Sequence, residues 1–305
     1  MIHSLNVRLR LAFLLSALAL ALVSAACSGT GANDSKSSFL VVATTIQMGA
    51  LTHAVAGNDA DVKTLIGAGV DPHEFEPGPS DLKAISDAKV IIRNGLGLDD
   101  WLDRTISSGG GKQKTITATD GVQLRTIDGH PDPHVWHDPL NDKIIVANIA
   151  NALAKADPTH ASAYQANAKA YEAKLDQVDQ QVRQIIDTIP PDNRKMVTDH
   201  DAFGYFIARY GLTYVGAVIP STSTQAEASA KDIAALETLI RKEHVKAIFS
   251  EETANPKVSE QIAHDTGAKI IDTLYGDSLG TPGSGANTVD GMILANARTI
   301  AEALK

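Results

Sequence analysis

Residues 158–189 read PTHASAYQANAKAYEAKLDQVDQQVRQIIDTI, with no glycine and no proline after the first position. Apolar side chains recur along this stretch at alternating spacings of four and three, at Tyr164, Ala168, Tyr171, Leu175, Val178, Val182 and Ile185. That period predicts one continuous helix with a single apolar stripe, about 45 Å long at about 1.5 Å per residue. Pro190 and Pro191 end the pattern, because proline lacks the backbone N–H that a helix needs.

Short β-branched runs alternate with helical patterns on both sides of this helix. They fall at residues 39–45, 62–66, 90–93 and 115–118, and then at 196–198, 213–218, 247–250 and 269–273. Strands that alternate with helices form parallel sheets built from βαβ units. We therefore expect an α/β fold of two lobes, each a mainly parallel sheet flanked by helices. The lobes would span residues 39–157 and 190–305, joined by the backbone helix at 158–189.

Capping signals mark where some of the intervening helices begin. Ser80 is expected to cap a helix over residues 81–88. Asp138 followed by Pro139 has the pattern of an N-cap and a first helical position. These signals place helices directly after the strands, as βαβ units require.

The first 26 residues have the pattern of a signal peptide. Arg8 and Arg10 precede an apolar run at residues 11–23 that is too short to span a bilayer comfortably. Small residues follow, and then Cys27, the only cysteine of the chain. An unpaired thiol is unusual in a secreted protein, so we expect lipid attachment at Cys27, with residues 27–38 as a flexible tether. An ordinary secretory signal, with Cys27 incidental, is the alternative.

The composition excludes some classes of function. The chain has 27 basic and 36 acidic side chains, so its net charge is −9. Loss of the first 26 residues removes two arginines and no acid, which leaves 25 against 36, or −11. An acidic chain without a basic, aromatic-rich stretch argues against nucleic-acid binding. A single cysteine excludes intrachain disulfides and a multi-thiolate zinc site.

Three histidines and one aspartate lie in short motifs that each follow a predicted strand. The motifs are Asp71-Pro72-His73-Glu74-Phe75-Glu76-Pro77, Asp132-Pro133-His134-Val135-Trp136, Asp199-His200-Asp201-Ala202-Phe203-Gly204-Tyr205-Phe206 and Tyr275-Gly276-Asp277-Ser278-Leu279. Open α/β sheets bind ligands at this edge, and imidazole and carboxylate are ligands of zinc and related divalent ions. Four such ligands close a coordination shell. The pattern therefore indicates a protein that carries a metal ion rather than one that reacts with it.

Residue spacing leaves two alternatives open at this site. His137 lies three residues after His134, so either or both could bind the metal, or one could support the other. For the carboxylate, Asp277 competes with other acids near predicted strands, which are Glu251, Glu252 and Asp272. Asp277 leads because it lies on a loop beside Gly276 that can turn inward.

At these motifs the chain resembles the zinc- and manganese-binding solute-binding lipoproteins of bacterial ABC transporters, a group that includes adhesin-type lipoproteins. The resemblance covers residues 39–304 and includes the four motifs in order, with the long helix between the second and third. It implies a two-lobed clamp whose metal ligands are His73, His134, His200 and Asp277. His200 at the third position is the zinc-type residue, so zinc is favoured and manganese is kept open.

The resemblance also implies the setting in which the protein works. We expect a monomer, lipid-anchored at the outer face of the cytoplasmic membrane or in the periplasm, which delivers its metal to the membrane permease of an ABC importer. It would not be an enzyme. The alternatives are a zinc-dependent hydrolase, a surface adhesin, and a binder of chelated metal or haem.

Overall fold

The computed structural model describes residues 39–108 and 114–305. The expected signal peptide, tether and lipidated Cys27 lie outside the described residues. Within Ser37–Lys305, which forms one compact unit, the elements divide into a first half, a long helix and a second half.

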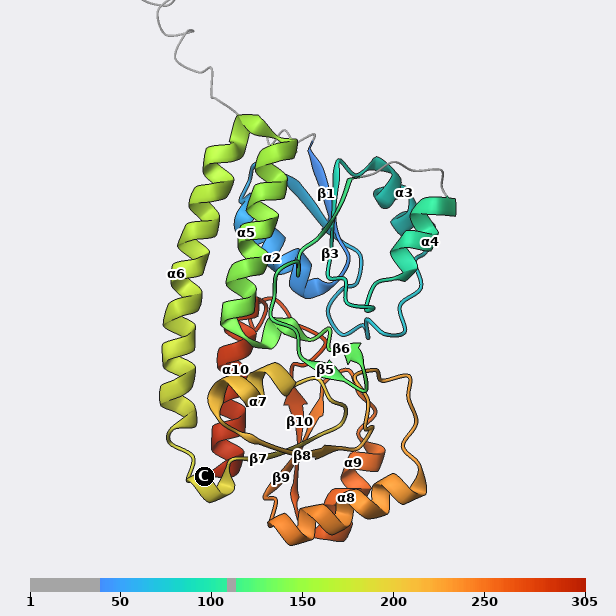
Figure 1. The fold of residues 1–305 in the computed structure, drawn as a ribbon, viewed down its shortest axis with the longest axis vertical. Helices are drawn as coiled ribbons and strands as arrows, with labels where there is room; N and C mark the ends of the chain where they lie inside the picture. Colours follow the sequence, from blue (N-terminus) through green and yellow to red (C-terminus); the bar gives the residue numbers. More distant parts are fainter. Residues whose placement is uncertain (1–38, 109–113) are drawn as a thin grey trace, which may run out of the picture. The chain divides into compact units, whose positions relative to one another are not determined.

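The first half is a four-stranded parallel sheet in the order β2-β1-β3-β4, followed by a small hairpin (Figure 1). Its elements are β1 (Leu40–Ala43), α2 (Ile46–Ala56), β2 (Asp61–Thr64), α3 (Pro79–Asp87), β3 (Val90–Arg93), α4 (Trp101–Ser108), β4 (Lys114–Thr117), β5 (Thr126–Ile127), β6 (His130–Pro131), the 3₁₀ turn η1 (Val135–His137) and α5 (Pro139–Ala156).

The second half contains another four-stranded parallel sheet, in the order β10-β9-β7-β8. Numbered along the chain, each sheet has its strands in the order 2-1-3-4, so the two halves share one topology. The second-half elements are the 3₁₀ turn η3 (Pro191–Asn193), β7 (Lys195–Thr198), α7 (Gly204–Tyr210), β8 (Thr213–Ala217), α8 (Ala230–Glu243), β9 (Ala247–Glu251), α9 (Lys257–Thr266), β10 (Lys269–Leu274) and α10 (Val289–Leu304). The expected α/β fold with two parallel sheets is confirmed.

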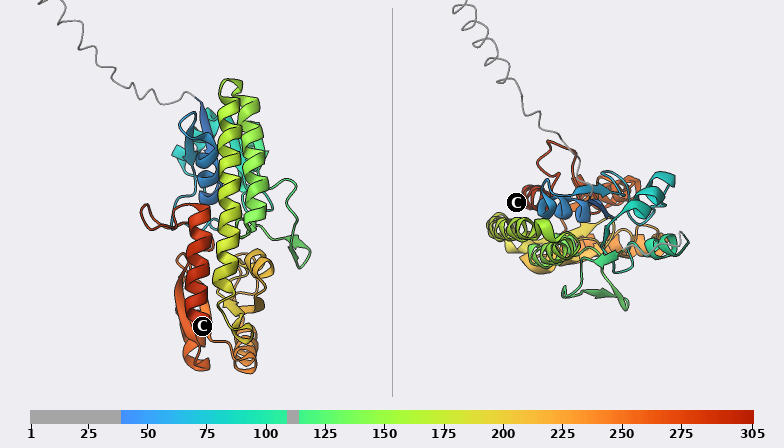
Figure 2. Two further views of the ribbon diagram at one scale, coloured as in Figure 1. Left: turned by 90° about the vertical axis from the view of Figure 1, so that its left-hand side faces the viewer. Right: turned by 90° about the horizontal axis from the view of Figure 1, so that it is seen from above.

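Helix α6 (Ala161–Ile186) is the predicted long helix, entered through the 3₁₀ turn η2 (Pro158–His160). It packs on α5 and α2 of the first half and on α10 and α7 of the second. The left view of Figure 2 shows it running along both halves. Its buried side chains are Tyr164, Ala168, Leu175, Val178, Val182 and Ile186. In the part of the chain that the structure describes, no helix is both long and apolar enough to cross a membrane. The lobe boundaries at residues 157 and 190 stay a prediction.

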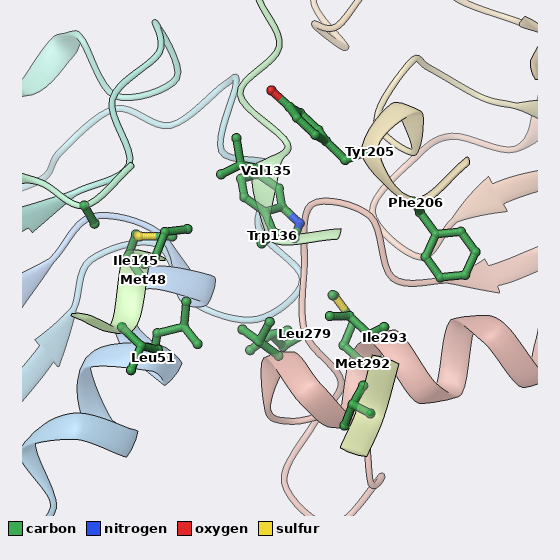
Figure 3. Packing of buried hydrophobic residues seen from close by; sticks show 14 of the residues in the cluster. Met48, Leu51, Val135, Trp136, Ile145, Tyr205, Phe206, Leu279, Met292 and Ile293 are labelled. Atoms are coloured by element: carbon green, nitrogen blue, oxygen red, sulfur yellow. The ribbon is translucent and has the colours of Figure 1, made fainter. Parts of the chain in front are cut away.

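One hydrophobic cluster extends through both halves. It contains Met48 and Ile145 from the first half together with Phe206 and Met292 from the second. Figure 3 shows Trp136 between these two groups of side chains. The Trp136 indole N–H also donates to the carbonyl oxygen of Gly276 at 2.9 Å. Because apolar burial is continuous across the halves, separating them would expose a large apolar surface to water.

The structure corrects one expected helix boundary. Helix α3 begins at Pro79, and its N-cap is Gly78 rather than Ser80. The Gly78 N–H donates to Asp81 Oδ2 at 3.0 Å. Proline is well suited to the first helical position, where its missing N–H has no intrahelical partner to lose, so the cap lies two residues earlier than expected.

Asp142 of α5 is a buried carboxyl group whose two oxygens have no hydrogen-bond partner among the described residues. Burial raises its pKa well above the usual value, and Asp138 and Asp290 raise it further. The pKa of this group is higher in the folded chain than in the unfolded chain, where it is about 3.8. The free energy of unfolding therefore falls as the pH rises above about 3.8. The carboxyl group therefore destabilises the folded chain more at neutral pH than at acid pH.

We therefore expect Asp142→Asn to stabilise the metal-free protein by about 1–3 kcal/mol at pH 7 and by less at pH 4. Urea unfolding at the two pH values measures this difference. Asp176→Asn is the matched control, because that carboxylate is half-exposed and pairs with Lys143 at the surface. A gain that is equal at both pH values would contradict the expected role of the buried charge.

Candidate metal site

His73 lies on the loop between β2 and α3, and the second half holds this loop in place. The His73 N–H donates to Asp71 Oδ1 at 2.8 Å, and Asp71 Oδ2 accepts from the Thr224 hydroxyl at 2.7 Å. The Gly69 N–H donates to Ser278 Oγ at 2.8 Å. Chain segments from both halves therefore fix where the His73 imidazole lies.

His134 follows the β5–β6 hairpin and is oriented by Asp132, two residues before it. Asp132 Oδ1 lies 2.7 Å from His134 Nδ1 and also accepts the His134 N–H at 3.1 Å. Both side chains are fully buried. A carboxylate on Nδ1 leaves Nε2 of the imidazole free to bind a metal.

His200 and Asp277 follow β7 and β10, and Glu251 at the end of β9 contacts both. Glu251 Oε1 lies 2.9 Å from His200 Nδ1, and Glu251 Oε2 accepts the Asp277 N–H at 2.8 Å. The Glu251 N–H in turn donates to Asp199 Oδ2 at 2.9 Å. Gly276 makes this arrangement possible, because a Cβ atom there would overlap the Glu251 carboxylate.

The four predicted residues come together at one point. The Nε2 atoms of His73 and His200 each lie 3.3 Å from Asp277 Oδ2, and His134 Nε2 lies 3.3 Å from Asp277 Oδ1. His134 Nε2 is 3.4 Å from Nε2 of both His73 and His200. One ligand atom from each residue lies within 4.8 Å of the others. Side chains from both halves of the fold thus converge on a volume the size of a metal coordination sphere.

The charges around this point favour a cation. Burial opposes the charged form of His134, yet Asp277 and Asp132 raise its pKa to about 9. Burial likewise opposes charge on His200, but Glu251 and Asp277 raise its pKa well above the usual value. Burial raises the pKa of Asp277, but His200 and His134 hold it well below the usual value. Without metal, bound protons therefore balance the Asp277 carboxylate.

His73 is the ligand candidate nearest to solvent. Its side chain is 8% exposed, whereas those of His134, His200 and Asp277 are at most 1% exposed. A cleft of about 860 Å³ lies beside His73 and is lined by Phe75 and Trp101, among others. An ion that enters from this cleft reaches His73 first.

The competing residues lie outside the four-residue cluster. His137 is buried and stacked on Phe203, with ring centroids 4.6 Å apart, and its ring nitrogens have no hydrogen-bond partner among the described residues. Burial and the nearby His134 lower its pKa to about 3. Glu252 and Asp272 are exposed. Asp199, His200 and Glu251 form a second group with metal-ligand spacing, which shares His200 with the first.

The supporting roles of Asp132 and Glu251 are not predicted by the sequence patterns. Asp132 stands two residues before His134 in the Asp-Pro-His motif, and this short spacing is a signal that a carboxylate can reach back to the imidazole. From the sequence, Glu251 is only a competitor of Asp277 as a metal ligand. No local pattern links Glu251 to His200, because the two residues meet only when β9 pairs with β7.

Comparison with known proteins gives a family match over nearly all of the described chain. Residues 41–303 match the ZnuA family, described as the periplasmic component A of a zinc-uptake complex. The manganese-binding lipoprotein MntA of Halalkalibacterium halodurans is 32% identical over 93% of this chain and 95% of its own length. The iron ABC transporter substrate-binding lipoprotein MtsA of Streptococcus pyogenes is 31% identical over 97% of this chain and 98% of its own.

A solved structure has the same fold. The periplasmic zinc-binding protein TroA of Treponema pallidum superimposes with a TM-score of 0.81 at 30% sequence identity. The superposition covers 87% of this chain and 98% of the TroA chain. The two-lobed arrangement and the order of its elements are therefore shared with an experimentally determined structure.

Proposed function

This chain belongs to the ZnuA family of periplasmic metal-uptake components, and we propose that its cargo is Zn²⁺, bound by His73, His134, His200 and Asp277. As a member of this family it captures a divalent metal ion outside the cytoplasm for an ABC importer, whose permease is its membrane partner. The identity of the ion and of its ligands is the proposed part.

The spacing of the four side chains is the observation that carries the proposal. Tetrahedral zinc with bonds of about 2.0–2.1 Å places its ligand atoms about 3.3–3.4 Å apart. With Oδ2 as the Asp277 ligand atom, four separations of 3.3 and 3.4 Å fit edges of such a tetrahedron, namely those of Oδ2 to His73 and His200 and those of His134 to the same two imidazoles. His134 Nε2 lies 3.3 Å from the other carboxylate oxygen, Oδ1. Three imidazoles also favour zinc over manganese, which binds more weakly in the Irving–Williams order and prefers oxygen ligands.

Manganese is the second candidate, because the similar lipoprotein MntA is named for manganese. Metal analysis of protein purified without added metal, followed by competition between zinc and manganese, tests the choice. We expect one zinc ion per chain, which manganese displaces only in large excess. Displacement of zinc by an equal concentration of manganese would contradict the proposal.

The arrangement supports a carrier rather than an enzyme. A catalytic zinc usually has three protein ligands and an open position for water, whereas four protein ligands fill a tetrahedral shell. Proteins of this family serve in transport. We accordingly propose no hydrolase activity, and no adhesin role, for this chain; we also propose that it works as a monomer.

Metal binding is expected to weaken as the pH falls, because zinc must displace the protons that His134 and His200 carry. With the pKa of His134 raised to about 9, proton competition should begin near pH 9 rather than near the ordinary histidine value. The zinc dissociation constant should then rise about tenfold per pH unit for each proton displaced. Chelator-competition titrations from pH 9 to pH 6 measure the slope, and a flat profile would contradict it.

The lipid anchor at Cys27 is also a proposal. It is supported by the position of Cys27 after the apolar run at residues 11–23 and the small residues at 24–26, and by the lipoprotein names of MntA and MtsA. Cys27→Ser should move the protein from the membrane fraction to the soluble fraction while its zinc affinity stays the same. Fractionation of cells with both forms measures this, and a wild-type protein found in the soluble fraction would support a plain secretory signal instead.

A further inference from the structure

Arg125, in the segment between β4 and β5, joins two acidic side chains that come from different halves of the fold. Its Nη1 donates to Asp132 Oδ2 at 2.7 Å and to Asp201 Oδ1 at 3.0 Å. Its Nη2 donates to Asp201 Oδ2 at 3.0 Å. The Arg125 side chain is 28% exposed, whereas the side chains of Asp132 and Asp201 are 0% and 7% exposed. One side chain thus bridges the halves at a partly buried position.

One of these aspartates contacts a proposed metal ligand, and the other is next to a proposed ligand in the chain. The other oxygen of Asp132 contacts His134 Nδ1 at 2.7 Å. Asp201 directly follows His200, and its N–H donates to the carbonyl oxygen of Ser221. Arg125 therefore connects the segment that carries His134 with the segment that carries His200.

Tyr205 strengthens the same bridge. The backbone N–H of Arg125 donates to the Tyr205 hydroxyl at 3.0 Å, and that hydroxyl donates to the carbonyl oxygen of Asp132 at 3.1 Å. Two-pronged arginine–carboxylate pairs fix orientation as well as distance, which a lysine ammonium does not. The network therefore restrains both the position and the rotation of the two ligand segments.

We propose that Arg125 is a positioning residue that holds His134 and His200 at metal-binding distance before the ion arrives. This inference rests on the proposed site of His73, His134, His200 and Asp277. A preformed ligand set loses less conformational entropy when it binds an ion, so its affinity is higher. An arginine that only tied the halves together would contribute to stability but leave the metal affinity unchanged.

Gly204 offers a way to displace Arg125 without removing its charge. A Cβ atom at Gly204 would overlap the Arg125 guanidinium group, which is the flexible end of a long side chain. Gly204 is the first residue of α7, where alanine is readily accommodated. Gly204→Ala should therefore shift the guanidinium group away from Asp132 and Asp201 while the fold is retained.

The test measures zinc affinity by chelator competition and the unfolding temperature of the metal-free protein. Supporting side chains of metal sites typically contribute about 10–100-fold in affinity, and we expect a loss in this range for Arg125→Ala. Gly204→Ala should lower the affinity in the same direction, and Arg125→Lys should restore it only in part. The double variant Arg125→Ala with Gly204→Ala should bind zinc as Arg125→Ala does, because both changes break one bridge.

Arg209→Ala is the matched control. Arg209 also bridges two carboxylates, with Nη2 2.9 Å from Asp179 and Nε 3.2 Å from Asp138, but it contacts none of the four proposed ligands. We expect Arg209→Ala to lower the unfolding temperature and to keep zinc affinity within about threefold of wild type.

The results of these measurements distinguish a failure of the positioning role of Arg125 from a failure of the proposed metal site. Arg125→Ala and Gly204→Ala proteins that bind zinc as tightly as wild type, while His134→Ala does not, would overturn the positioning role and leave the site intact. A His134→Ala protein that binds like wild type would instead overturn the site. If Arg125→Ala does not fold, Gly204→Ala and Arg125→Lys decide, since both keep a positively charged side chain at position 125.

Discussion

Replacement of His134 by alanine should weaken zinc binding by about 1,000-fold, or ~4 kcal/mol at about 1.4 kcal/mol per factor of ten. His134 is fully buried, its Nε2 lies 3.3–3.4 Å from the ligand atoms of the other three residues, and Asp132 orients it. Removing the imidazole takes away one of four ligands and leaves a hole that a water molecule fills poorly. Chelator competition at pH 7.5 measures the loss.

His137 provides the control for this experiment, because it lies three residues away and is equally buried. His137→Leu keeps the apolar packing against Phe203 and removes the imidazole. Its zinc affinity should stay within about threefold of wild type, since His137 lies outside the ligand cluster. Equal losses in the His134 and His137 variants would show that the proposed ligand set is wrong.

Zinc should also strongly stabilise the folded protein. An ion that binds only the folded state at about 1,000 times its dissociation constant adds about 4 kcal/mol. For a chain of this size that corresponds to a rise of roughly 10 °C in unfolding temperature. Differential scanning calorimetry with and without zinc measures the shift. His134→Ala protein should show almost none at the same zinc concentration, and an equal shift in that variant would point to binding elsewhere.

This stabilisation should come with little change of shape. Helix α6 packs on both halves without a break, and one hydrophobic cluster continues between them. Hinge closure needs a few residues that absorb large dihedral changes, whereas bending α6 would break its backbone hydrogen bonds. Small-angle scattering should therefore give radii of gyration with and without zinc that differ by less than about 1 Å. A larger difference would require a hinge within or beside α6.

The contacts that hold the His73 loop are also relevant to metal release. The loop of His73 is held by Thr224 and Ser278 of the second half. Because His73 is also the most exposed of the four proposed ligands, we propose that metal release begins with a local movement of this loop.

Local sequence patterns were enough to predict the strands of the two four-stranded sheets and the long helix of this fold. The alternating four-and-three spacing from Tyr164 to Ile185 predicts α6, because a helix has 3.6 residues per turn whatever surrounds it. Apolar β-branched runs predict the strands for a similar reason, since a strand buried on both faces must be apolar throughout. The four ligand candidates followed from their positions just after strands.

The residues at which helices begin were harder to predict than the helices themselves. The cap of α3 lies at Gly78 instead of Ser80, because Pro79 is accommodated within the first turn of the helix. Asp138, by contrast, caps α5 as predicted, and its side chain accepts the Leu140 N–H. Turn chemistry allows several starts within a few residues, and local sequence does not always select one.

The sequence by itself determined the helix, the two βαβ halves and the candidate ligands, because each depends on residues close together in the chain. Residue spacing left the choice between His134 and His137 open, although the family resemblance implied His134. The tertiary structure separates the two by turning one toward Asp277 and the other onto Phe203. It alone brought Glu251 to His200 and Arg125 to Asp201. Those contacts join residues 51 and 76 positions apart, and their distances are set by the packing of two sheets against one helix rather than by any local pattern.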